Sequence, residues 1–133
     1  MTSTRDPVIA GNLARAGLGG THLLADLFGV HADLLTEEQT VTECLLAALR
    51  KSGFNVLSQC SHKFPGAGSG VTAVALLSES HAAIHTYPEH GYVAVDVFSC
   101  GMPDPEVALA HLRDVLRPTR ICVHTQTRGE SGG

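Results

Sequence analysis

Tryptophan is absent from this chain of 133 residues, and the other large aromatic side chains are two tyrosines and four phenylalanines. Stacking platforms for nucleic-acid bases are therefore scarce. The nine lysines and arginines form no cluster, and the formal net charge is −4. These features argue against a surface that binds nucleic acid or an anionic membrane.

Long apolar runs are missing as well. No stretch approaches the roughly 20 residues that span a bilayer, and the N-terminus lacks the basic, apolar and small-residue order of a secretory signal. We therefore expect a cytoplasmic protein without a membrane partner. No C-x-x-C pair occurs, and in that compartment cysteines are expected to be buried thiols rather than disulfides. The cysteines are Cys44, Cys60, Cys100 and Cys122.

The length fits one domain with a core of ordinary size. We expect a flexible N-terminal arm over 1–20, a folded domain over 21–127 and a flexible tail over 128–133. Apolar residues that alternate or run on between turn signals predict six strands. The predicted strands cover residues 22–28, 54–64, 71–77, 82–87, 92–98 and 120–127.

Two helices are predicted from their start signals. Residues 36–39 read Thr-Glu-Glu-Gln, a capping-box pattern, and Gly53 supplies the stop of this first helix. Asp104 is a suitable N-cap for a second helix, with Pro105 as its first residue. This order of elements predicts an α+β fold, an antiparallel β-sheet with two helices on one face. A second copy covering the other face would give an α/β/β/α sandwich.

Reactive side chains are densest over residues 78–91. The plainest interpretation is a pair of edge strands with polar outward faces. A metal site is another, with ligands drawn from His81, His85, His90 and Cys100. However, His81 and His85 would lie about 13 Å apart on one strand, whereas each ligand of one zinc ion lies about 2 Å from it. We therefore expect no metal to be bound by this set.

A hydrolase of the Ser–His–acid type is a further interpretation. Ser80 is not set in a G-x-S-x-G turn, and the chain is short for the fold that presents one. The signal for this chemistry is weak.

Residues 79–101 read ESHAAIHTYPEHGYVAVDVFSCG. This run closely resembles the core of the short bacterial and archaeal S-adenosylmethionine decarboxylase proenzymes. The segments GTHLLADLFG (20–29), SHKF (61–64) and GVT (70–72) resemble further parts of that family. The resemblance covers about residues 20–127, and its central motif is highly specific.

The resemblance implies a pyruvoyl-dependent decarboxylase that cleaves its own backbone between Glu79 and Ser80. In that family the serine attacks the preceding carbonyl, and elimination and hydrolysis then leave an N-terminal pyruvoyl group. Ser80 would thus become the cofactor. His85 matches the processing base, and Thr72 stands where a processing serine is usual. Cys100 matches the general acid that protonates the substrate's α-carbon, a role that suits a thiol.

The resemblance also implies a substrate site for S-adenosylmethionine, whose product would be the aminopropyl donor for spermidine-type polyamines. Phe64 matches a phenylalanine that stacks on adenine, and Glu89 matches an acid that binds the ribose hydroxyls. Tyr87 stands where the family usually has tryptophan. No metal and no pyridoxal phosphate are implied, because a terminal carbonyl forms a Schiff base with the substrate amine and serves as the electron sink.

Departures from the family pattern keep other functions open. Tyr87 is one, and a loop from Phe64 to Val71 that is about two residues longer than usual is another. Some members of the family decarboxylate arginine or ornithine, and such a substrate remains an alternative. A non-catalytic module that binds a small molecule is a second alternative, although it would be expected to lose the reactive serine, histidine or cysteine.

The predicted hairpins allow a geometric test. If the strands before and after residues 78–79 pair around that turn, paired residue numbers sum to 157 and Thr72 lies opposite His85. A second turn centred on residues 89–90 brings Ser80 within about one position of Cys100. Each half of the site is therefore consistent with the hairpins.

Ser80 and His85 are different, because five extended residues separate them by roughly 16 Å, too far for proton transfer. We therefore predict a homodimer with two shared sites, in which His85 and Thr72 of one copy serve Ser80 and Cys100 of the other. Asp96 lies on the same strand face as Tyr92 and Phe98, and we expect it to have a polar partner in the site or the interface.

Overall fold

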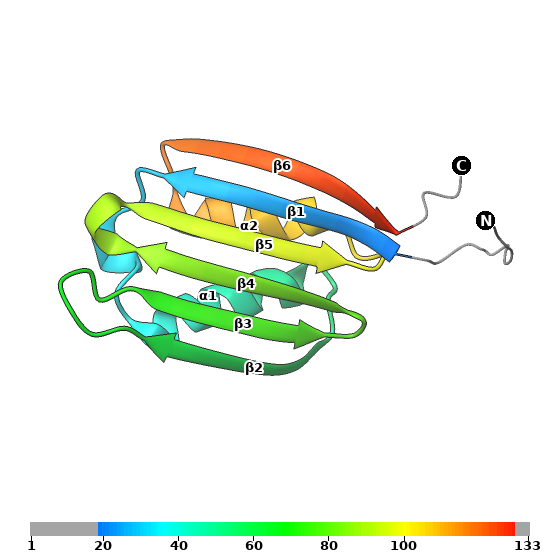
Figure 1. Ribbon diagram of the computed structural model, residues 1–133, viewed down its shortest axis with the longest axis horizontal. Helices are drawn as coiled ribbons and strands as arrows, with labels where there is room; N and C mark the ends of the chain where they lie inside the picture. Colours follow the sequence, from blue (N-terminus) through cyan, green and yellow to red (C-terminus); the bar gives the residue numbers. More distant parts are fainter. Residues whose placement is uncertain (1–18, 130–133) are drawn as a thin grey trace, which may run out of the picture.

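The computed structural model describes residues 19–129 (Figure 1). Residues 1–18 of the predicted arm and 130–133 of the predicted tail lie outside this range. The described residues form six strands, two α-helices and two short 3₁₀ helices. These are β1 (Gly19–Phe28), η1 (Ala32–Leu34), α1 (Glu38–Lys51), β2 (Val56–Lys63), β3 (Val71–Leu77), β4 (Ser80–Tyr87), η2 (Pro88–His90), β5 (Tyr92–Ser99), α2 (Pro105–Leu116) and β6 (Arg120–Gly129).

The strands form one sheet in the order β2-β3-β4-β5-β1-β6, and each neighbouring pair is antiparallel. Both helices lie on the same face of this sheet (Figure 1). The predicted α+β class and the placement of the helices are confirmed. Within residues 19–129, neither helix combines the length and the apolar character that crossing a bilayer requires.

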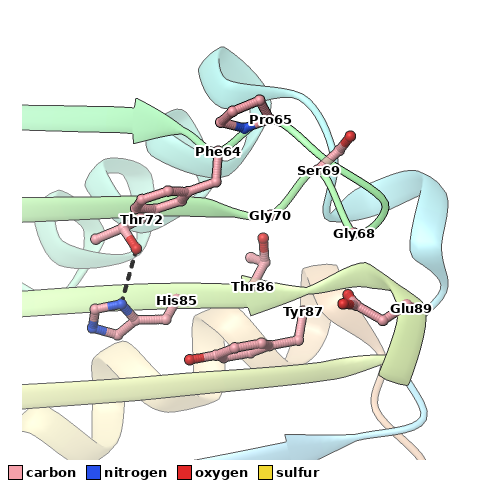
Figure 2. A pocket seen from close by; sticks show the side chains of 10 residues that line it. All are labelled: Phe64, Pro65, Gly68, Ser69, Gly70, Thr72, His85, Thr86, Tyr87 and Glu89. Carbon is pink, nitrogen blue, oxygen red and sulfur yellow. Dashed lines mark hydrogen bonds between the residues drawn. The ribbon is translucent and has the colours of Figure 1, made fainter.

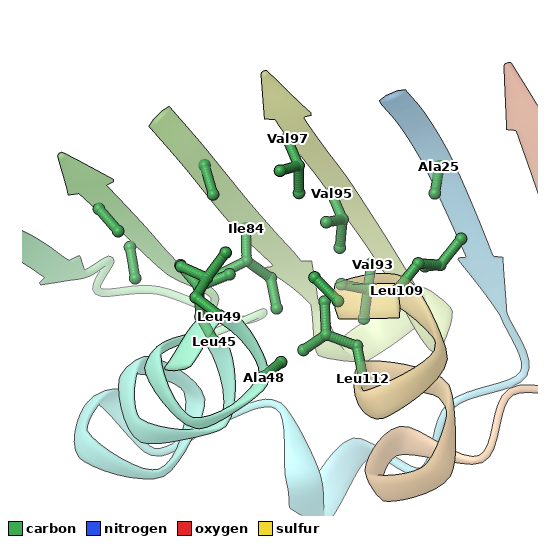
Figure 3. Packing of buried hydrophobic residues seen from close by; sticks show 14 of the residues in the cluster. Ala25, Leu45, Ala48, Leu49, Ile84, Val93, Val95, Val97, Leu109 and Leu112 are labelled. Carbon is green, nitrogen blue, oxygen red and sulfur yellow. The ribbon is translucent and has the colours of Figure 1, made fainter. Parts of the chain in front are cut away.

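The core lies between the helices and one face of the sheet (Figure 3). Leu45 and Leu49 of α1 and Leu112 of α2 are fully buried there against branched residues of the central strands. The pleat places alternate residues of each strand on this face. In β4 these residues are Ser80, Ala82, Ile84 and Thr86, and all four are buried.

The opposite face of the sheet, here called the open face, carries apolar side chains that the described residues 19–129 cover only in part. Leu24 is 42% exposed, Val74 is 38% exposed and Leu76 is 55% exposed. They come from β1 and β3, at positions that alternate with the buried core residues. Apolar groups gathered on one sheet face are typical of an interaction surface.

The second helix begins as predicted, with the Asp104 carboxylate accepting a hydrogen bond of 2.9 Å from the Glu106 amide. The first helix differs from the capping-box prediction. Its N-cap is Glu37, one residue after Thr36, and the Glu37 carboxylate accepts a bond from the Thr40 hydroxyl instead of from a backbone amide. The backbone of residue 37 is extended, so the helical turn starts one position later than the pattern indicates.

The prediction of buried thiols is wrong for two cysteines. Cys60 and Cys122 are exposed, and Cys100 is partly exposed. Cys60 lies in β2 and Cys122 in β6, the two edges of the sheet. Their side chains fall in the register rows of Val74 and Asp26, on the open face, which is turned away from α1 and α2.

The strand register matches both predicted hairpins. Thr72 pairs with His85 across β3 and β4, and His81 pairs with Phe98 across β4 and β5. The first hairpin turns through two residues only, and Glu79 adopts a left-handed conformation with φ 57°. Such a short turn leaves one register available, which is why the prediction holds.

Candidate active site

Thr72 and His85 form a hydrogen-bonded pair on the open face of the sheet. Thr72 Oγ1 lies 3.0 Å from His85 Nδ1 (Figure 2). Both side chains are half-buried, and they are held by directly paired positions of β3 and β4. The imidazole therefore has a fixed orientation, with its Nε2 atom directed away from Thr72.

A hollow surrounds this pair, and it brings together the residues predicted to bind the substrate. Phe64 reaches into it from the end of β2, Tyr87 from the end of β4, and Glu89 from η2 (Figure 2). The half-exposed ring of Phe64 is packed edge-on by His62, with ring centroids 4.7 Å apart. The longer loop therefore leaves Phe64 in the hollow.

The loop over 64–70 closes tightly on Glu89. Its base is joined by a hydrogen bond of 2.8 Å from the Phe64 amide to the Gly70 carbonyl. At Gly68 a β-carbon would lie 2.5 Å from both carboxylate oxygens of Glu89. Glycine at this position lets the loop backbone lie against the carboxylate (Figure 2).

The wall of the hollow is supported by an aromatic pair that the sequence did not single out. Tyr92 stacks on Tyr87 with ring centroids 5.3 Å apart, and its hydroxyl donates a hydrogen bond to the Asp26 carboxylate. That hydrogen bond, with burial, raises the pKa of Tyr92 to about 12. The two tyrosines flank residues 88–91 in the sequence, so their stacking could have been predicted. The contact with Asp26 could not, because Asp26 lies in β1 and the sequence did not indicate which strands lie beside β1.

Ser80 and Cys100 lie together at the other end of β4. The Cys100 amide donates a hydrogen bond of 3.1 Å to Ser80 Oγ, and Ser80 is only 7% exposed. The residue before it, Glu79, is the one with the left-handed backbone. The predicted proximity of Ser80 and Cys100 is therefore what the structure shows.

The structure does not bring Ser80 and His85 together within one chain. They are the first and sixth residues of β4, and alternation points Ser80 toward the helices and His85 toward the open face. The two side chains are thus roughly 16 Å apart along the strand and also point to opposite faces of the sheet. One chain holds two half-sites at opposite ends of a strand.

Asp96 has the polar partner that was expected. Its Oδ2 atom lies 2.9 Å from His22 Nε2 on the neighbouring strand β1. It also lies 3.8 Å from His81 Nε2.

Residues 21–129 match the model of a protein family described as S-adenosylmethionine decarboxylase. The chain is 42% identical over 111 residues to the S-adenosylmethionine decarboxylase proenzyme of Persephonella marina, covering 83% of this chain and 82% of the relative. It is 40% identical to the corresponding proenzyme of Aquifex aeolicus, covering 83% and 81%.

Solved structures agree with this match. The crystal structure of the adenosylmethionine decarboxylase from Aquifex aeolicus superposes with a TM-score of 0.77 at 36% identity, covering 85% of this chain and 92% of that one. The Trypanosoma brucei AdoMetDC-delta26 monomer shares the fold at 13% identity, with a TM-score of 0.56. The chain therefore belongs to the S-adenosylmethionine decarboxylase family.

Proposed function

We propose that this protein is a pyruvoyl-dependent decarboxylase of S-adenosylmethionine that first cleaves its own backbone between Glu79 and Ser80. Membership of the family supports the substrate and the reaction class. The observation that carries the proposal is the contact between the Cys100 amide and Ser80 Oγ, beside a backbone turn at Glu79.

In self-processing, the Ser80 hydroxyl attacks the carbonyl carbon of Glu79 and the chain passes from an amide to an ester. The left-handed conformation of Glu79 supports cleavage at this position, because a non-glycine residue held there stores roughly 1–3 kcal/mol of strain. The Cys100 amide fixes the direction of the hydroxyl. His85, oriented by Thr72, is the base assigned to this step.

The cofactor would be made from Ser80 itself, so the fit of the site depends on the surroundings of that residue. Ser80 begins β4, beside a hollow lined by Leu76, His81 and Phe98, which leaves room for a new chain end. A terminal pyruvoyl group supplies an electron sink for the carbanion left when carbon dioxide departs. Cys100 lies next to this position and is assigned as the acid that donates a proton to the substrate's α-carbon.

The hollow around His85 is assigned to the nucleoside part of the substrate. Phe64 and Tyr87 offer ring faces for the adenine, and such stacking is typically worth about 1–3 kcal/mol per base. Glu89 is assigned to bind the ribose, because its carboxylate oxygens can accept hydrogen bonds from the ribose hydroxyls. Decarboxylation would yield the aminopropyl donor used in polyamine synthesis.

A homodimer completes the site in this account. His85 and Thr72 lie on the open face, while Ser80 lies at the far end of β4. The apolar side chains of the open face support its burial against a second copy, which would form the α/β/β/α sandwich. Related by a twofold axis, each copy's His85 would then serve the Glu79–Ser80 turn at the end of its partner's β4.

Two measurements test the function. Denaturing mass spectrometry should find the chain split after Glu79, and the Ser80→Ala variant should stay intact. Release of labelled carbon dioxide should then be fast with S-adenosylmethionine and slow with arginine or ornithine. An uncut wild-type chain would overturn the processing step, and preference for a basic amino acid would overturn the substrate.

A further inference from the structure

Three potential metal ligands converge on the open face, outside the residues assigned to catalysis. They are His22 of β1, His81 of β4 and Asp96 of β5, and one ligand atom from each lies within 4.8 Å of the others. Both imidazole Nε2 atoms point at the same oxygen, Asp96 Oδ2, at 2.9 Å for His22 and 3.8 Å for His81.

The strand register produces this convergence. Phe98 of β5 pairs with His22 on one side and with His81 on the other. Asp96 stands two positions along on the same strand face. Phe98 packs edge-on against the His22 ring at 5.9 Å and stacks on the His81 ring at 5.7 Å, so it holds both imidazoles in place. Three hydrogen-bonded strands make a rigid support for the group.

A hydrogen bond to Asp96 explains the position of His22 but not that of His81. His22 lies at hydrogen-bonding distance from Asp96, but 3.8 Å is too long for a bond from His81. A tetrahedral zinc ion bound at about 2.0–2.2 Å by nitrogen and oxygen sets neighbouring ligand atoms roughly 3.3 Å apart. The observed distances to Asp96 Oδ2, 2.9 Å from His22 and 3.8 Å from His81, fall on either side of that value.

We propose that His22, His81 and Asp96 bind a divalent transition-metal ion, with Zn²⁺ as the best match to two imidazoles and one carboxylate. The histidines considered together in the sequence analysis do not form this set, since only His81 recurs here.

The site also has a structural consequence, which rests on the proposed function. After cleavage between Glu79 and Ser80, His22 belongs to the N-terminal chain, whereas His81 and Asp96 belong to the C-terminal chain. The ion would then join the two cleavage products beside the new chain end. It takes no part in the decarboxylation.

Binding of Co²⁺ and Zn²⁺ to the full chain, freed of any purification tag, tests the site. Co²⁺ should give the visible absorption of a tetrahedral complex, saturate at one ion per chain, and be displaced by Zn²⁺. His81→Ala should weaken binding by more than about tenfold, because even loss of a supporting partner costs that much. Asp96→Asn, which keeps the shape of the side chain, should do the same.

His124→Ala is the matched control, because His124 is an exposed histidine of β6 in the register row of Leu24 on the open face. It should bind the metal as wild type does. The Ser80→Ala chain is measured alongside, and binding by it supports the site even if the proposed cleavage fails. Equal affinity in wild type and in folded His81→Ala, or the absence of a saturable cobalt signal, would overturn the inference.

Discussion

Ser80 and His85 belong to the same strand but point to opposite faces of the sheet. Ser80 is buried on the helix side at the first residue of β4, and His85 lies half-buried on the open face five residues later. The Thr72 hydroxyl meets His85, and the Cys100 amide meets Ser80. Each chain thus carries both halves of the proposed site, too far apart to act together within that chain.

Thr72 should limit the rate of self-cleavage. Its methyl group restricts rotation about χ1, and a serine hydroxyl at this position would be less restricted. We expect Thr72→Ser to process faster than wild type. Thr72→Val, which keeps the shape but loses a hydrogen bond worth about 1 kcal/mol, should process roughly fivefold more slowly. The appearance of the cleaved chain over time, followed by mass spectrometry, measures both; equal rates in all three chains would remove Thr72 from the mechanism.

Gly68 should matter for substrate affinity and not for self-cleavage. Alanine there would place its β-carbon against the Glu89 carboxylate and push that side chain aside. We expect Gly68→Ala to raise KM for S-adenosylmethionine several-fold without changing the extent of cleavage. In a Glu89→Ala background the same change should add little, because the displaced group is already gone. An equal rise in both backgrounds would show that the contact with Glu89 is not the cause.

Tyr92 should ionise at a higher pH than an ordinary tyrosine. Its hydrogen bond to Asp26 raises the pKa of Tyr92 to about 12, from an ordinary value of 10.0. The contribution of this hydrogen bond to the stability of the folded protein is therefore fully present below pH 10. It is lost as the pH rises through the raised pKa of Tyr92 in the folded protein. In Tyr87→Phe, absorbance of tyrosinate reports Tyr92 alone, and its midpoint should fall when Asp26→Asn is added. An unchanged midpoint would mean that Asp26 does not hold the phenol.

Thiol reactivity should separate the cysteines by their place in the fold. Burial raises the pKa of the Cys44 thiol to about 11, so little thiolate is present at neutral pH. Cys60 and Cys122 are exposed on the edge strands. In protein diluted until it is monomeric, iodoacetamide should therefore alkylate Cys60 and Cys122 well before Cys44, as peptide mapping would reveal. Fast labelling of Cys44 in the folded protein would contradict its packing on α1.

Local signals in the sequence predicted the parts of the fold that are set locally. The two-residue turn before Ser80 determined the pairing of Thr72 with His85, and the Asp104-Pro105 signal predicted where α2 begins. Contacts made through β1 could not be predicted in the same way. Its placement between β5 and β6 joins His22 to Asp96 across 74 positions of the chain, and no turn fixes that register.

Exposure was the other property that the sequence did not predict. Cys60 lies inside a strand, and only its register with Val74 shows that its side chain points to the open face, away from the helices. The dimer that would cover the open face is likewise a property of two chains. It follows from the distance between Ser80 and His85 and not from any local pattern.

A mixed dimer tests the central claim most directly. One chain carries Ser80→Ala and keeps His85, and the other carries His85→Ala and keeps Ser80; distinct tags allow the mixed pair to be isolated. The His85→Ala homodimer, which lacks any processing histidine, is the control and should remain uncut. In the mixed dimer the shared-site account predicts that the chain with intact Ser80 is cleaved after Glu79, as mass spectrometry would show. If that chain stays whole while wild type is cleaved, His85 does not act across the interface and the account is wrong.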